Sequence, residues 1–123
     1  MTGNSYIVDA NIWIDYFVRG RFEDELLHNA LETPAIVLVE VAGYLVSHEF
    51  SEEDWRKCLK GILQYSAILP LDLERALVAS KLRKIHRLKT VDSVIYSYVE
   101  PGKRLLTQDA DFKGLENVDY RRK

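Results

Sequence analysis

Short apolar runs alternate along this chain with stretches in which apolar residues recur at helical spacing. Four runs predict buried strands, at 6–8 (YIV), 35–38 (AIVL), 67–69 (AIL) and 104–107 (RLLT), and 117–120 (NVDY) predicts a weaker fifth. Strands that alternate with helices are typical of βαβ units. The pattern therefore predicts an α/β fold with a mostly parallel sheet of four to five strands, covered by helices on both faces.

The predicted helices fill the intervals between these runs. Their ranges, taken from apolar spacing and from helix start and stop signals, are 11–17, 22–31, 39–47, 51–64, a helix capped by Asp72, and 90–99. In the helix that follows Asp72, the spacing of Val78, Leu82 and Ile85 predicts one apolar stripe.

Length and composition are those of one globular domain. The 123 residues are 47% hydrophobic and 29% charged, and they contain no repeat or linker, so a single domain over 1–123 is the simplest organisation. Cys58 is the only cysteine and cannot form an internal disulfide. No apolar run approaches the roughly 18 residues of a membrane span, and we find no secretion signal. We therefore expect a cytoplasmic protein without membrane contact.

Acidic residues follow the predicted strands. Asp9 comes directly after YIV, Glu40 follows AIVLV in the first turn of a helix, and Asp109 and Asp111 follow RLLT. Asp92 lies in the first turn of the helix over 90–99. Because functional sites of parallel sheets form beyond the carboxyl ends of the strands, we expect these carboxylates to meet at one edge.

Such a cluster calls for a counter-charge. Two unit charges about 4 Å apart repel by about 4 kcal/mol at an effective dielectric constant of 20, and a divalent cation reverses the sign of that interaction. Carboxylates suit Mg²⁺ or Mn²⁺, whereas zinc favours His or Cys, and neither occurs here at useful spacing. A cluster made only of carboxylates indicates metal-assisted chemistry on phosphates.

Taken singly, each acid also has a structural interpretation. Asp9 can cap the following helix, with Asn11 making a local hydrogen bond. Asp92 can interact favourably with the dipole of its helix, with Thr90 as N-cap. Glu40 can be a buried ion-pair partner, and the two acids after RLLT can form a turn or cap. All of these structural interpretations would have to be true at the same time for the acids to be explained without a metal site.

Four segments resemble the acidic motifs of PIN-domain ribonucleases, in order and in approximate spacing, and among these the VapC toxins of prokaryotic toxin–antitoxin pairs. They are VDANIWIDYF, VLVEVAGYL, TVDSVIYSYV and LLTQDADFKGL, and the resemblance extends from Tyr6 to about Val118. It implies a three-layer α/β/α sandwich, Mg²⁺- or Mn²⁺-dependent endoribonuclease activity on RNA, and inhibition by a cognate antitoxin.

The resemblance assigns catalytic positions residue by residue. Asp9, Glu40, Asp92 and Asp109 match the first to the fourth acid of the family. We expect Asp9, Asp92 and Asp109 to hold one or two metal ions, and Glu40 to orient or deprotonate the attacking water. Water attack of this kind leaves a 5′-phosphate and a 3′-hydroxyl.

Three further polar residues are expected to support the acids. Asn11 matches the polar residue two positions after the first acid. In the pattern T-x-D-x-D-F, Thr107 and Asp111 flank the fourth acid.

Basic residues are concentrated in one segment although the net charge is −2. KLRKIHRLK at 81–89 carries five basic residues and no acid, and RRK at 121–123 is also basic. Segment 81–89 either leads an RNA backbone toward the acids or forms the solvated outer face of its helix. The sequence leaves both interpretations open.

Partners and competing functions follow from the same reasoning. The helices between 22 and 64 can expose an apolar groove for an antitoxin helix or for a second copy of the chain, and we expect a homodimer. One alternative is an inactive PIN-like module that binds RNA or protein. A weaker alternative is an aspartate-nucleophile phosphatase of the haloacid-dehalogenase type, which expects an aspartate where this chain has Asn11.

Overall fold

A five-stranded parallel sheet forms the centre of the computed structural model, which describes residues 5–123. The strands are β1 (Ser5–Val8), β2 (Ala30–Pro34), β3 (Ala67–Leu69), β4 (Lys103–Thr107) and β5 (Val118–Tyr120). Their order across the sheet is β3-β2-β1-β4-β5, and every neighbouring pair is parallel. The predicted parallel sheet is therefore confirmed, with five strands.

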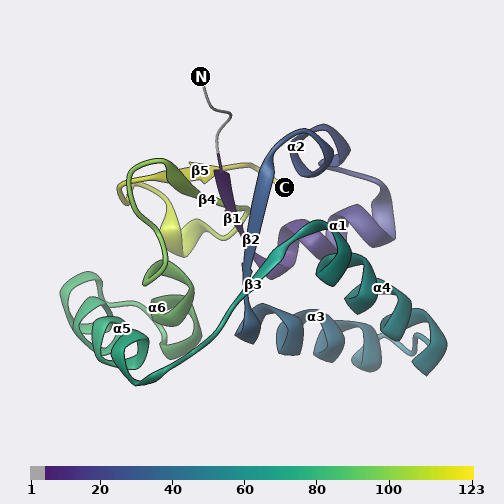
Figure 1. Ribbon diagram of the computed structural model, residues 1–123, viewed down its shortest axis with the longest axis horizontal. Helices are drawn as coiled ribbons and strands as arrows, with labels where there is room; N and C mark the ends of the chain where they lie inside the picture. Colours follow the sequence, from purple (N-terminus) through teal and green to yellow (C-terminus); the bar gives the residue numbers. More distant parts are fainter. Residues whose placement is uncertain (1–4) are drawn as a thin grey trace.

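Helices flank the sheet on both sides. They are α1 (Ala10–Arg19), α2 (Glu23–Leu27), α3 (Ala35–Ser47), α4 (Glu52–Tyr65), α5 (Leu73–His86), α6 (Thr90–Tyr96) and the 3-10 turn η1 (Ala110–Phe112). Figure 1 shows α1, α3 and α4 on one side of the strands and α5 and α6 on the other. The expected α/β/α layering is confirmed. Within 5–123, no helix is long and apolar enough to cross a membrane.

The two central strands carry the core. Ile7 and Val8 of β1 and Leu105 and Leu106 of β4 are fully buried. On α1, Trp13 is also fully buried, and its indole N–H donates a hydrogen bond to Thr33 of β2 at 3.1 Å. Because β1 and β4 are packed on both faces, the residues that follow them are held in fixed positions.

The prediction for 22–38 is wrong in two places. The expected helix over 22–31 is the short α2 followed by β2, and the expected strand over 35–38 is the first turn of α3. The run AIVLVEVAGYLV is apolar nearly throughout, and periodicity does not separate a buried strand from a buried helix in such a run. Glu40 consequently lies in the second turn of α3 rather than in the first turn of a helix after a strand.

Helix caps are partly as predicted. Ser51 and Asp72 cap α4 and α5 with side-chain hydrogen bonds to backbone N–H groups. The N-cap of α6, however, is Lys89 rather than Thr90. The stripe predicted on α5 is also wrong at Ile85, which is 69% exposed. The buried residue of this helix, which packs against α6, is Ala79.

The helical assignment of 35–47 can be tested with two valines. Val37 is fully buried and Val39 is 70% exposed, whereas a strand would place residues two apart on the same face. We expect Val37→Ala to lower the free energy of unfolding by about 1–3 kcal/mol and Val39→Ala to change it by less than about 0.5 kcal/mol. Urea unfolding of both variants measures this. Equal losses would contradict the helix.

Candidate active site

Asp9 follows β1 and is the first residue of the site. Its side chain is buried and caps α1, because Oδ1 accepts a hydrogen bond from the Ala10 N–H at 2.8 Å. Oδ2 accepts from the Thr107 hydroxyl at 2.7 Å and from Asn11 Nδ2 at 3.4 Å. These donors stabilise the carboxylate, but burial raises the pKa of Asp9 above its ordinary value.

Thr107, the last residue of β4, connects the ends of the two central strands. Its hydroxyl donates to Asp9 and accepts a hydrogen bond from the Asp109 N–H at 3.0 Å. Asp109 in turn caps η1, since its Oδ1 accepts from the Asp111 N–H at 2.9 Å. One buried hydroxyl thus fixes Asp9 relative to the backbone that carries Asp109.

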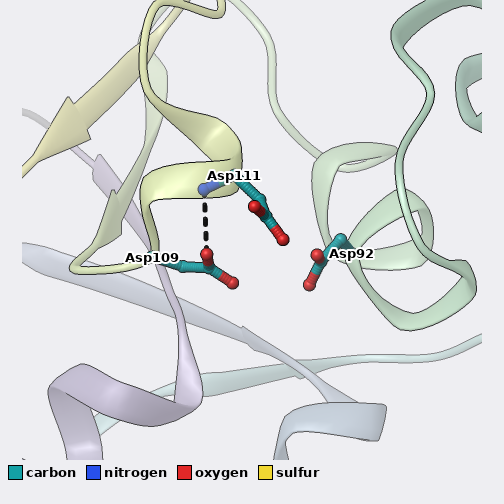
Figure 2. Close-up of side chains that lie close together, drawn as sticks. All are labelled: Asp92, Asp109 and Asp111. Atoms are coloured by element: carbon teal, nitrogen blue, oxygen red, sulfur yellow. Dashed lines mark hydrogen bonds between the residues drawn. The ribbon is translucent and has the colours of Figure 1, made fainter.

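Three carboxylates converge between α6 and η1. Asp92, Asp109 and Asp111 each offer one oxygen, and the three oxygens lie within 4.8 Å of one another. Figure 2 shows the three side chains directed toward a common space, Asp92 from the first turn of α6 and the other two from the segment after β4. Lys89 Nζ lies 3.8 Å from Asp111 Oδ2 at the edge of this cluster.

Glu40 faces the same acids from α3. Its Oε1 is buried, and no hydrogen-bond partner for that atom is found among residues 5–123. Burial, followed by the charges of Asp9, Asp92 and Asp109, raises the pKa of Glu40 to about 7. The interpretation of Glu40 as an ion-pair partner is wrong for the described part of the chain, where no basic side chain pairs with it.

The acids act on one another electrostatically. Burial, then Asp109, Asp9 and Asp111, raises the pKa of Asp92 to about 6, although Lys89 opposes the shift. Asp109 contributes in the same direction at Asp9. The structure therefore brings the four predicted acids into one electronegative site, and a divalent cation would reverse the sign of their interaction.

The donor set fits a hard divalent ion. Carboxylate oxygens are the ligands that Mg²⁺ and Mn²⁺ prefer, and three of them converge here. Glu40, whose Oε1 has no hydrogen-bond partner among residues 5–123, is close enough to these acids for their charges to raise its pKa. Asp111, which we expected only to support the fourth acid, offers an oxygen to the same cluster as Asp92 and Asp109. Asp9 also caps α1, as its structural interpretation predicted. The same residue therefore caps a helix and belongs to the acidic site.

A polar network beside the acids was missed in the sequence. The Gln108 N–H donates to Asn11 Oδ1 at 3.0 Å, and its Nε2 donates to Asp15 Oδ2 at 3.0 Å. Asp15 is buried and pairs with Arg19 at 2.5 Å and Arg21 at 2.7 Å, which accounts for its charge without a metal. A single glutamine between the threonine and the aspartate of the fourth motif gives no sequence signal for this role.

Fold and site together define a class: a parallel α/β sandwich with carboxylates gathered where the central strands end. Residues 6–117 match the PIN domain family, and this chain belongs to that family. No curated protein sequence matches the chain.

Solved structures share this fold. A VapBC complex from Rickettsia felis bound to a promoter DNA fragment aligns with a TM-score of 0.74 at 20% identity, over 97% of this chain and 98% of that chain. A toxin–antitoxin complex from Klebsiella pneumoniae aligns with a TM-score of 0.76 at 22% identity, over 93% and 95%. A DNA-bound VapBC from Salmonella typhimurium aligns with a TM-score of 0.70 at 16% identity, over 99% and 98%.

The raised pKa of Glu40 predicts a pH dependence of stability in metal-free buffer. Its folded value of about 7 exceeds the ordinary 4.5, so between these values the folded state binds more protons than the unfolded state. The contribution of Glu40 to the free energy of unfolding therefore falls as pH rises through this window. We expect Glu40→Gln to match the wild type near pH 4.5 and to be more stable than the wild type above pH 7.

Chemical denaturation across this pH range, with EDTA present, measures the difference. Glu116→Gln, at an exposed position in the loop before β5, is the control and should follow the wild-type curve. A Glu40→Gln curve parallel to that of the wild type would contradict the burial of an unpaired carboxylate.

Proposed function

We propose that this chain is the toxin of a type II toxin–antitoxin system and that it cleaves RNA as a metal-dependent endoribonuclease. The observation that carries the proposal is the convergence of Asp9, Glu40, Asp92 and Asp109 at one edge of the sheet. Membership of the PIN domain family supports nuclease chemistry. The VapBC complexes that share the fold support the role as a toxin.

In this proposal, the acids divide into metal ligands and a base. Asp9, Asp92 and Asp109 would hold one or two Mg²⁺ or Mn²⁺ ions, with Asp111 in reach of the same space as the last two. A bound divalent ion activates water and neutralises charge on the phosphodiester. Thr107 and Asn11 keep Asp9 in a single orientation through hydrogen bonds to its Oδ2.

Glu40 is proposed to receive the proton of the attacking water. Before any cation binds, the pKa of Glu40 is already raised to about 7, and Oε1 has no competing hydrogen-bond donor among residues 5–123, so this oxygen is available to accept a proton. The water oxygen then forms a bond to phosphorus, the P–O3′ bond breaks, and the departing 3′-oxygen takes up a proton from solvent water. The products carry a 5′-phosphate and a 3′-hydroxyl.

An antitoxin partner is proposed on the exposed apolar surface of α2, α3 and α4. Large apolar side chains are exposed to solvent on these helices and in the loop after α3: Leu27, Val39, Val46, Phe50, Leu63 and Tyr65. Exposed apolar side chains on neighbouring helices are typical of protein–protein contacts, and an amphipathic helix can cover those of α3 and α4. The same surface is compatible with the homodimer expected from the sequence.

The competing functions are less well supported. An inactive module would be expected to lack one of the acids, and all four are in place. A haloacid-dehalogenase phosphatase needs a second aspartate two residues after the nucleophile. Asn11 occupies that position and is held by Asp9 and Gln108.

Cleavage of a labelled single-stranded RNA by the purified protein tests the proposal. We expect Mg²⁺-dependent cleavage that EDTA abolishes, with 5′-phosphate ends on the products. Asp92→Asn keeps the shape of the side chain and should lower the rate by about 100-fold or more, because it removes a ligand charge.

A charge-matched control separates this effect from net charge. Asp24→Asn removes one acid from α2, where the side chain of Asp24 is 93% exposed, and should leave the rate unchanged. Undiminished cleavage in EDTA, or full activity of Asp92→Asn, would contradict the proposed mechanism.

A further inference from the structure

A basic cleft opens beside the acids. It consists of two adjoining hollows of about 470 and 570 Å³ that share Asn11, Gln108 and Lys123. One hollow extends along α1 to Arg19 and to Tyr44 of α3, and the other extends to Asp109 and Arg122. Each has the size of a small-ligand pocket, and together they run across the end of β4.

The charge of the basic cleft is positive although it reaches the acidic site. Four basic side chains line it, Arg19, Arg21, Arg122 and Lys123. Two of them, Arg19 and Arg21, pair with Asp15. With Asp15 and Asp109 also in the lining, the formal charge of the basic cleft is +2. Arg122 and Lys123 have no acidic partner among residues 5–123, so both are available to a ligand that arrives next to Asp109.

The wall of the basic cleft also offers aromatic rings. Tyr44 lies four residues after Glu40 on α3, which places both side chains on the same face of that helix. Tyr120 lines the hollow that contains Asp109. Bases of a single strand stack on such rings, while basic side chains neutralise its phosphates.

Segment 81–89 lacks this continuity with the site. Its own hollow is lined by Ser80, Arg83, Lys84, Arg87 and Leu88, and contains none of the predicted catalytic residues. Lys89 reaches Asp111 at 3.8 Å, but with a side chain that is 84% exposed. An RNA strand that lay along this hollow would still have to cross to the acids.

We propose that the basic cleft is the path of single-stranded RNA across the site, with Arg122 and Lys123 contacting backbone phosphates next to the scissile bond. The inference rests on the proposed ribonuclease function and assigns the surface that holds its substrate. It also assigns the basic side chains of Arg83, Lys84 and Arg87 to a solvated surface at the C-terminal end of α5.

Two charge-matched double variants test the assignment. Arg122→Ala/Lys123→Ala and Arg83→Ala/Arg87→Ala each remove two positive charges, from the basic cleft and from α5 respectively. The probe is a fluorescent single-stranded RNA, and the readout is its anisotropy with the 123-residue chain in EDTA, over a series of salt concentrations. Circular dichroism of each variant checks that it is folded.

We expect only the basic-cleft variant to bind more weakly, by roughly tenfold or more near 0.1 M salt. Each lost phosphate contact lowers the slope of log K against log salt by about 0.7 for a single strand, so the slope should fall by about 1.4. Equal weakening of both variants, weakening of the α5 variant alone, or no binding by the wild type would overturn the inference.

Cleavage in Mg²⁺ distinguishes failure of the inference from failure of the proposed function. If the wild type cleaves RNA and the basic-cleft variant has unchanged KM and kcat, the assignment of the RNA path to the basic cleft is wrong, and the proposed ribonuclease function is unaffected. If the wild type does not cleave RNA, the ribonuclease is wrong, and the anisotropy series still decides whether RNA occupies the cleft.

Discussion

The parallel pairing of β1 with β4 is the constraint on which the site depends. Val8 lies opposite Leu106, and the Asp9 N–H donates to the Leu106 carbonyl at 3.1 Å, so that Asp9 and Thr107 leave the sheet side by side. The Thr107 hydroxyl then closes the contact with Asp9 Oδ2 at 2.7 Å. A slip of one residue in this register would turn each side chain to the opposite face and separate the acids.

Burial of the acids, and after it their convergence, opposes folding in the absence of a cation. The pKa values of Asp9, Glu40 and Asp92 are all raised, which means that the folded state disfavours their charged forms. Asp15, a short distance along α1, shows the opposite balance, because Gln108 and two arginines hold its pKa below the ordinary value. The carboxylates of the site are therefore in an unfavourable electrostatic environment, whereas Asp15 beside them is in a favourable one. Such a local cost in stability is typical of functional sites.

How far the sequence predicted the structure depended on the kind of signal. Asp9 and Asp109 were placed correctly because each directly follows a strand with a clear apolar pattern. The strand boundary at Pro34 was missed, since the apolar run after it fits either a strand or a helix, and β2 itself contains Glu32 and Thr33. The role of Gln108 depends on contacts 93 to 97 residues away in sequence, which no local pattern encodes.

Every step proposed for the site requires that the acids at the end of the sheet hold a divalent metal ion. Anomalous scattering from a crystal of this protein grown with Mn²⁺ tests it most directly, since the signal locates the ion without assumptions about activity. We expect an anomalous peak among the carboxylates of Asp92, Asp109 and Asp111, next to Asp9 and Glu40. A crystal saturated with Mn²⁺ that shows no peak there, or a peak only at another surface, would contradict a metal site at these acids.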